Sequence, residues 1–314
     1  MSNHSLKGNI AFPLQAVKKT ILVKLDSISD TPKHLLQLKL LTRLIAIACL
    51  LNTFLLLPYG SEFFGTQVYY DRGDFDTSLW HHWLIHLSVH PSFVSYGYYF
   101  VTAQLFLLTL VLFGIGLRAT LPLAFLATAN VWSLASVQLD GGNNLIQILF
   151  LMLLFCNVSG SPNKSKSEFF RTLSNTSTNC IFRLMQFQVV FVYFCAGLYK
   201  LQGDLWQNGM ALYYTLQVPE YSHPWATEFV LAYPTIASLA THSILLFQYL
   251  FPVLIFVPQT RRLMIIWGIL FHIGIAFVMG LSMFGLYLIV AYTLFLNEEE
   301  CKFMGVKEDL SLST

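Results

Sequence analysis

The sequence predicts an all-α fold, a polytopic bundle of helices embedded in a membrane. Hydrophobic residues make up 55% of the 314 residues, and only 11% are charged. The mean hydropathy is +0.60. Because a soluble domain carries about 25% charged residues, this chain has too few charges to cover a globular surface. Its apolar residues also gather in long stretches, and backbone groups inside lipid must be hydrogen-bonded within their own segment, so we predict that these stretches are helices.

Eight apolar segments follow one another, and a helix needs roughly 20 residues to cross a bilayer. They cover residues 41–59, 95–117, 119–138, 144–158, 181–200, 236–258, 263–280 and 282–297. The fourth and the eighth are short for a full crossing. Only Gly280, Leu281 and Ser282 divide the last two segments. If these two segments form one long broken helix, the chain has seven spans instead of eight.

The segments divide the chain into three parts. Residues 1–37 form a basic leader that lacks the short apolar core of a cleavable signal. Residues 38–297 form one transmembrane domain, with an outer loop at 60–94 and a flexible inner linker at 159–180. Residues 298–314 form a short tail.

The positions of the basic residues predict the orientation, because loops rich in lysine and arginine stay in the cytoplasm. With eight spans, 16 of the 18 basic residues fall on one side, and only Arg72 and Lys200 fall on the other. We therefore predict cytoplasmic N- and C-termini. The chain is expected to be a multi-pass protein of a bacterial inner or plasma membrane, with Lys200 on the periplasmic or extracellular side. Its expected partner is the lipid bilayer, and we expect no nucleic acid.

Segment 181–200 carries the residues with the clearest chemistry. Gln186, Tyr193 and Lys200 are spaced by seven, and Gly197 lies three residues before Lys200, so all four share one helix face. An ionisable residue at the edge of hydrocarbon is by default a functional hypothesis. Burial away from water disfavours the charged form of an amine, and only the neutral form accepts a proton. The alternative is a snorkelling lysine on a stripe that holds helices together by hydrogen bonds.

The residues around Lys200 resemble a known family. The matching positions are Arg183-x-x-Gln186-x-Gln188, Tyr193-Phe194-x-Ala196-Gly197-x-x-Lys200-Leu201 and Trp206-x-x-Gly209. Further matching positions are Phe271-His272, Gly280 to Phe284, Arg43, Arg118 and the turn Asp140-Gly141-Gly142. Together they resemble the HTTM (horizontally transferred transmembrane domain) family, over roughly residues 38–297. That family includes the membrane domain of vitamin K-dependent gamma-carboxylase and peptide-maturation proteins of the sporulation-delaying-protein B type.

The resemblance implies a reaction and a site. In the carboxylase, the lysine at the place of Lys200 acts as a base on a reduced quinone, and the strong base formed after oxygen addition deprotonates a peptide glutamate. This implies lyase or ligase chemistry of the carboxylase type, with Lys200 and His272 as the catalytic residues. An exported peptide or a lipid-borne molecule is the implied substrate. The residues expected to line the site are Gln186, Tyr193, Gly197, Trp206, Gly209, Asn144 and Asp140.

Two departures from the carboxylase point to another reaction or another peptide. The stretch comparable to the carboxylase's histidine-bearing segment, residues 141–147, contains no histidine. Asn144 keeps a hydrogen-bonding group there but cannot shuttle a proton. The sequence given also has no counterpart of the carboxylase's large lumenal domain.

The outer loop at 60–94 is rich in aromatic residues and histidines. His82, His86 and His90 fall on one helical face, and two histidines four residues apart can share a metal. The zinc-protease pattern requires a glutamate between the histidines, but this loop has Trp83, Leu84 and Ile85 at those positions. The favoured interpretation is an interfacial helix, and we predict no metal.

Three functions therefore stay open. The first is an enzyme that acts at the outer membrane face, with a reduced quinone as a candidate cofactor. The second is a non-catalytic partner in the maturation or export of a secreted peptide. The third is a small transporter in which Lys200 and His272 relay protons. A quinone-sized pocket open to lipid beside Lys200 favours the first. A closed, dry bundle with Lys200 paired to Asp204 favours the second, and a water path from both faces past Lys200 and His272 favours the third. Asp140 is an alternative partner for Lys200.

Overall fold

The computed structural model describes residues 33–65, 96–159 and 168–306. All regular secondary structure in these ranges is helical. The longer helices are α2 (Leu35–Leu56), α5 (Gly97–Leu112), α6 (Leu117–Leu134), α7 (Gly141–Leu153), α8 (Glu168–Leu201), α12 (Pro234–Leu254), α13 (Pro258–Val278) and α14 (Ser282–Ala291). The shorter elements are η1 (Leu57–Tyr59), α3 (Gly60–Phe63), η5 (Ser136–Gln138), α9 (Asp204–Gln207), α10 (Ala211–Thr215), η6 (Pro219–Tyr221), α11 (Pro224–Ala232), η7 (Tyr292–Phe295) and α15 (Glu298–Phe303). The prediction of an all-α fold is confirmed.

Four helices in the described ranges are long and apolar enough to cross a membrane: Leu35–Phe63, α8, α12 and α13. Three further apolar helices, α5, α7 and Ser282–Phe295, are shorter. The structure therefore supports a membrane protein with four candidate spans. The count of eight spans and the orientation of the termini stay predictions.

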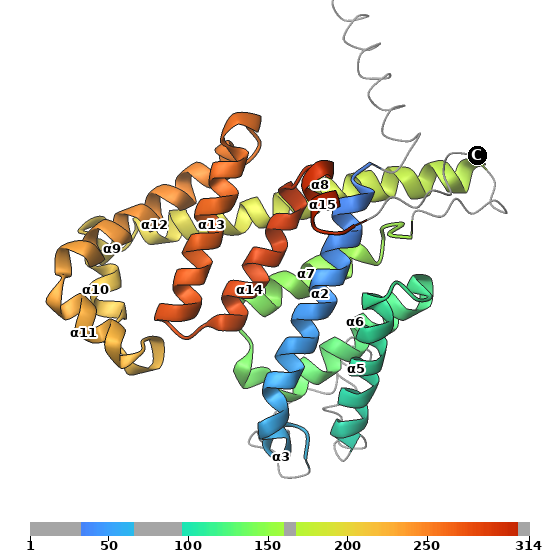
Figure 1. Ribbon diagram of the computed structural model, residues 1–314, viewed down its shortest axis with the longest axis horizontal. Helices are drawn as coiled ribbons and strands as arrows, with labels where there is room; N and C mark the ends of the chain where they lie inside the picture. Colours follow the sequence, from blue (N-terminus) through green and yellow to red (C-terminus); the bar gives the residue numbers. More distant parts are fainter. Residues whose placement is uncertain (1–32, 66–95, 160–167, 307–314) are drawn as a thin grey trace, which may run out of the picture.

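Segments 263–280 and 282–297 form two helices, so the alternative of one long broken helix is wrong. The chain turns at Gly280, whose φ of 72° suits glycine because an added Cβ is disfavoured there. Helices α13 and α14 then pack closely, since a Cβ built on Gly285 would lie 2.6 Å from the carbonyl oxygen of His272. The two segments thus form a helical hairpin (Figure 1).

Helix α8 begins earlier than the apolar pattern indicates. It starts at Glu168, inside the stretch 159–180 that was expected to be a flexible linker, and it runs for 34 residues. At 1.5 Å per residue it is about 51 Å long, well beyond the thickness of the hydrocarbon core. Residues 168–173 at its start are exposed, and contacts hold the turns that follow. The hydroxyl of Ser177 donates to the carbonyl of Phe155, and the amide of Lys33 donates to Asn179.

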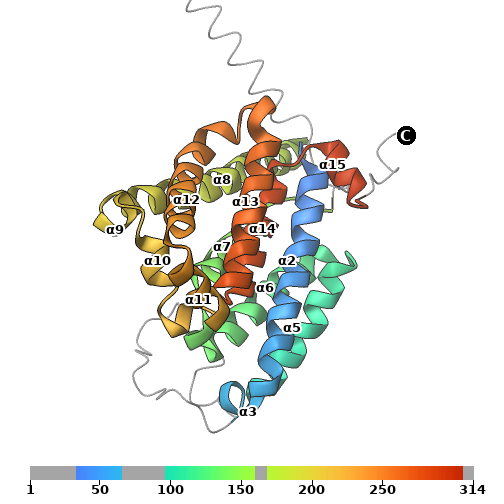
Figure 2. The same ribbon diagram turned by 60° about the vertical axis from the view of Figure 1, so that its left-hand side comes forward.

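Helices α2, α13 and α14 lie side by side, and α8 crosses behind them (Figures 1 and 2). One large apolar cluster joins these helices with α5, α6, α7 and α12. Buried hydrogen bonds between helices add to it. Thr53 of α2 donates to Gln104 of α5 at 2.9 Å, and Trp132 of α6 donates to Asn52 of α2 at 3.1 Å. Such polar contacts hold helices together where lipid removes the hydrophobic driving force.

The contacts define two ends of the bundle. One end joins the start of α2, the turn between α5 and α6, the start of α13 and the C-terminal helix α15. There Gln37 donates to the carbonyl of Leu296, and Arg262 binds Glu300 at 2.8 Å. Burial alone would raise the pKa of the Glu300 carboxyl, but hydrogen bonds from the Asn297 amide and Arg262, together with both arginine charges, bring this pKa below its usual value. The opposite end joins α3, the start of α7 and the turn between α13 and α14.

Candidate functional site

A partly open cavity of about 690 Å³ lies between α8, α12 and α13, with α10 and α14 at its edges. Its lining is mostly apolar and aromatic, and it includes Phe247 and Phe271. Four of the residues predicted for the site line it together: Lys200, His272, Tyr193 and Trp206. Tyr193 and Lys200 share α8 and Trp206 lies on α9 directly after it, whereas His272 comes from α13, so the fold brings His272 to the other three.

Lys200 is the penultimate residue of α8 and lies at the rim of the cavity, because its side chain is only half-buried. Its Nζ lies 5.0 Å from the ring centroid of Trp206, a cation–π contact. The turn after α8 makes this contact, since α9 begins at Asp204 and carries Trp206 back over the helix end. Within the described ranges no carboxylate pairs with Lys200. The pairs with Asp204 and Asp140 that were considered from the sequence are absent there.

A buried hydrogen-bond cluster forms the inner part of the site. The Tyr193 hydroxyl lies 2.7 Å from Nε2 of His272 and 2.5 Å from the hydroxyl of Tyr292. The three side chains come from α8, α13 and η7, and each is at most 3% exposed. Tyr193 lies two helical turns before Lys200, which is about 10 Å along the axis of α8.

Two buried polar atoms near this cluster have no hydrogen-bond partner within the described residues. They are Nδ1 of His272 and Oε1 of Gln248, and both residues line the cavity. A buried polar atom without a partner costs about 1–3 kcal/mol, so native proteins rarely leave one unpaired without a reason. An apolar cavity with a few convergent polar atoms is the usual form of a small-molecule site.

Three other residues predicted for the site on or near α8 pack against the protein instead of lining the cavity. The Gln186 amide donates to the carbonyl of Leu294 at 2.7 Å and accepts from Arg183 at 2.8 Å. Gly197 gives its carbonyl to the Tyr249 hydroxyl of α12 at 2.9 Å. Gly209 has a φ of 72°, and a Cβ there would lie 2.3 Å from the His242 ring, so this turn presses against α12.

Asp140 and Asn144 also do not line the cavity. Asp140 is the N-cap of α7, and its carboxylate accepts from the amides of Gly142 and Asn143. Asn144 is exposed in the first turn of the same helix. On the side of the cavity that faces the start of α7, the lining side chains belong to α14. A Cβ on Gly142 would lie 3.2 Å from Phe284, which lines the cavity.

Some predictions fall outside the described residues. The histidines of the outer loop, His82, His86 and His90, lie in the range 66–95. Among the residues that the structure does describe, no group of three histidine, cysteine, aspartate or glutamate side chains could hold a metal ion.

Gln248 of the cavity lining and Tyr292 of the buried cluster are not among the residues predicted from the sequence. Gln248 is a polar residue within the apolar segment 236–258, and that is a signal that could have singled it out. Tyr292 gives no such signal, because an aromatic residue within an apolar segment is ordinary. Only the packing of η7 against α8 and α13 brings its hydroxyl to Tyr193.

The fold and the cavity define the class: this is a helical membrane protein with a polar cluster at the base of an apolar cavity. Over 205 residues the chain is 28% identical to the sporulation-delaying protein SdpB of Bacillus subtilis (strain 168). The match covers 62% of this chain and 62% of that relative. No protein-family model matches the chain. No solved structure matches it either.

Proposed function

We propose that this protein is a membrane enzyme in which Lys200 removes a proton from a substrate bound in the cavity. The substrate is an exported peptide or a lipid-borne molecule. The observation that supports this most directly is the arrangement of the site. Lys200 lines an apolar cavity, and two other lining residues, His272 and Gln248, each carry a buried polar atom that has no partner among the described residues. A ligand with hydrogen-bonding groups, held against those atoms, would lie within the reach of the amine.

The choice between an enzyme and a non-catalytic partner follows from the same geometry. The cavity beside Lys200 has the size of a drug-like ligand or cofactor site, which favours an enzyme. A closed bundle with Lys200 paired to Asp204 would favour a non-catalytic role. The described residues show no such pair. The similarity to a sporulation-delaying protein supports an exported peptide as the substrate, in line with the resemblance carried by the Lys200 motif.

A reduced quinone fits the cavity as the cofactor. Trp267, Phe271 and Phe284 offer aromatic and apolar surface to a ring. Gln248 and His272 would hold the ring hydroxyls, because Oε1 of Gln248 is an acceptor and Nδ1 of His272 is an acceptor or a donor according to its tautomer. When bound, a reduced quinone supplies an acidic hydroxyl group and a source of reducing electrons. In this proposal Lys200 accepts the proton from the bound substrate, and the Tyr193 hydroxyl, which also contacts Tyr292, orients His272.

The test of the base uses secreted peptides. A strain that lacks this gene is complemented with the wild type, Lys200→Ala, Lys200→Arg or the control Lys302→Arg, and its culture supernatants are compared by mass spectrometry. We expect a peptide product whose yield falls by about 10²–10⁴-fold in both Lys200 variants, because arginine cannot act as a base. Full yield with Lys200→Arg would overturn the role as a base and leave a charge-dependent, non-catalytic role.

The test of the cofactor uses the purified protein. Gly274 lines the cavity and has open space where a Cβ would stand, so Gly274→Leu fills the cavity and Gly274→Ala barely changes it. We expect a quinone to be extracted with the wild type and with Gly274→Ala, and to be lost from Gly274→Leu. If the wild type contains no quinone, and an added reduced quinone leaves its Tm unchanged, the cofactor proposal fails while the proposal for Lys200 stands.

A further inference from the structure

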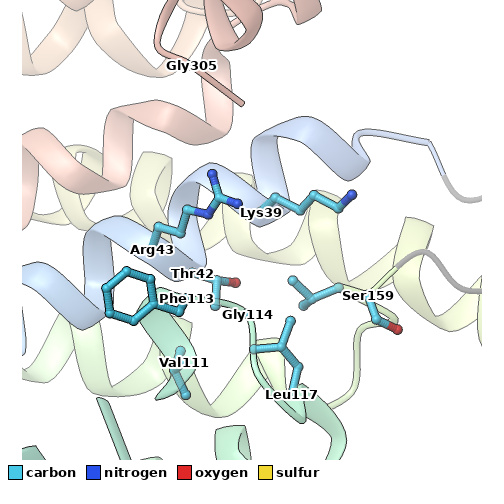
Figure 3. Close-up of a pocket in the computed structure, with 10 residues that line it drawn as sticks. Lys39, Thr42, Arg43, Val111, Phe113, Gly114, Leu117, Ser159 and Gly305 are labelled. Atoms are coloured by element: carbon cyan, nitrogen blue, oxygen red, sulfur yellow. The ribbon is translucent and has the colours of Figure 1, made fainter. Parts of the chain in front are cut away.

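A second cavity lies at the opposite end of the bundle from Lys200, between α2, the α5–α6 turn and α15. It has a volume of about 320 Å³. Lys39 and Arg43 of α2 line one side of it, and Phe113, Gly114 and Leu117 line another (Figure 3). The function proposed for Lys200 makes no use of this cavity.

The cavity is basic. Lys39 and Arg43 are four residues apart on α2, so their side chains share one helix face. No carboxylate is among the described residues that line the cavity. Helix α6 begins with Leu117 at its edge, and the first amide groups of a helix have no intrahelical acceptor and favour an anion. All three features favour a bound negative charge.

The two cationic side chains are the groups best placed to recognise that charge. The hydroxyls that line the cavity already donate within the protein: Thr42 to the carbonyl of Leu38 at 2.8 Å, and Ser159 to the side chain of Asn157 at 2.9 Å. An ammonium group has three donors and a guanidinium has five, so both cations can bind phosphate oxygens in addition to their contacts within the protein. A guanidinium binds phosphate oxygens through paired hydrogen bonds.

The surroundings of the cavity indicate that the ligand comes from the membrane. The α5–α6 turn joins two apolar helices and exposes Phe113 and Ile115, which are 70% and 54% exposed. Val111, Leu117 and Val158 give the same cavity an apolar side. A basic site with an adjacent apolar surface suits a molecule with a charged headgroup and acyl chains, whereas a free phosphate would use only the cations.

We propose that this cavity binds the phosphate group of an anionic phospholipid, with Lys39 and Arg43 on the headgroup and the apolar side against the first carbons of the acyl chains. The site would fix α2, the α5–α6 turn and the chain after α7 to one leaflet. This proposal is independent of the function proposed for Lys200.

The test compares lipids on the purified, delipidated full chain in detergent. Mixed micelles that contain either dioleoylphosphatidylglycerol or dioleoylphosphatidylcholine are titrated, inorganic phosphate is titrated separately, and Tm is recorded. We expect phosphatidylglycerol to raise Tm far more than phosphatidylcholine. The double variant Lys39→Gln/Arg43→Gln should bind phosphatidylglycerol about 30-fold more weakly, which corresponds to ~2 kcal/mol for two cations at the headgroup.

Arg118→Gln is the matched control, because Arg118 is exposed one residue after Leu117 but does not line the cavity. It should keep the affinity of the wild type, and the double variant should keep the wild-type Tm in lipid-free detergent. Equal stabilisation of the wild type and the double variant by phosphatidylglycerol would overturn the proposal. So would stabilisation by inorganic phosphate alone, because that result assigns the cavity to a soluble phosphate group.

Discussion

At the scale of single residues, the hydroxyl of Tyr193 occupies the centre of the buried cluster. It contacts both Nε2 of His272 and the hydroxyl of Tyr292, whereas each of those two groups has only this contact in the cluster. Gly268 leaves room for Tyr292, since a Cβ on Gly268 would lie 2.3 Å from the Tyr292 hydroxyl. The cluster is therefore positioned by tight packing, and the effect of losing one hydroxyl depends on which is removed.

Tyr193→Phe should destabilise the protein at least twice as much as Tyr292→Phe. Removing the Tyr193 hydroxyl leaves two buried groups without a partner, at about 1–3 kcal/mol each. Removing the Tyr292 hydroxyl leaves Tyr193 bonded to His272 and costs about 1 kcal/mol. The free energy of unfolding, measured by denaturant titration in detergent, distinguishes the two variants. Equal effects would show that the cluster is not connected through Tyr193.

The residues of the site could be predicted from the sequence only where local pattern carried information. The motif around Lys200 singled out Tyr193, Lys200 and Trp206, and the second match singled out His272. All four line one cavity, although their roles stay predictions. That Asp140 and Gly197 lie outside the cavity could not be predicted, because it depends on which helix each residue packs against. A short polar residue before a helix serves as a cap as readily as it serves a site, and a sequence does not separate the two.

At the scale of elements, the hairpin of α13 and α14 holds His272 in place. Gly285 of α14 allows the close approach to the backbone of His272, and the chain could not make this hairpin without the turn at Gly280. The apolar pattern predicted both helices but not their separation, because the pattern continues across the turn. The same limit applies to the first half of α8, where Ser177 and Asn179 make contacts with distant segments that no periodicity reveals.

Gly285→Ala should destabilise the protein by about 1–3 kcal/mol, the usual cost of an overpacked contact. The new Cβ would stand 2.6 Å from the carbonyl oxygen of His272, which is backbone and cannot move independently of α13. Gly274→Ala is the matched control on α13, since its Cβ meets nothing within 4 Å. In thermal unfolding the control should keep or slightly raise Tm, because alanine is the better helix former. Equal Tm values for the two variants would contradict the close packing of α13 and α14.

At the scale of the whole molecule, the basic residues divide between the two ends of the bundle. The segments joined at one end carry Lys33, Lys39, Arg43, Arg118, Arg261, Arg262 and Lys302. These are segments that the charge pattern assigned to the cytoplasmic side, and the contacts between α2, α13 and α15 bring them together. Lys200 lies at the far end of α8, at the rim of its own cavity. The sequence could predict this grouping because successive antiparallel helices place every second loop at the same end of the bundle.

This arrangement predicts which residues are reached from outside an intact cell. Single cysteines are placed at Asn208, which is exposed beside Lys200, and at Phe303, which is 93% exposed on α15. The exposed native Cys180 and Cys195 are replaced by serine. A membrane-impermeant maleimide should label Asn208→Cys in intact cells and should label Phe303→Cys only after the membrane is permeabilised. We expect this result because basic loops tend to remain in the cytoplasm, which predicts that the α15 end lies inside. Labelling of Phe303→Cys in intact cells, with protection of Asn208→Cys, would show the opposite orientation. The amine of Lys200 would then lie on the cytoplasmic side, where an exported peptide is made.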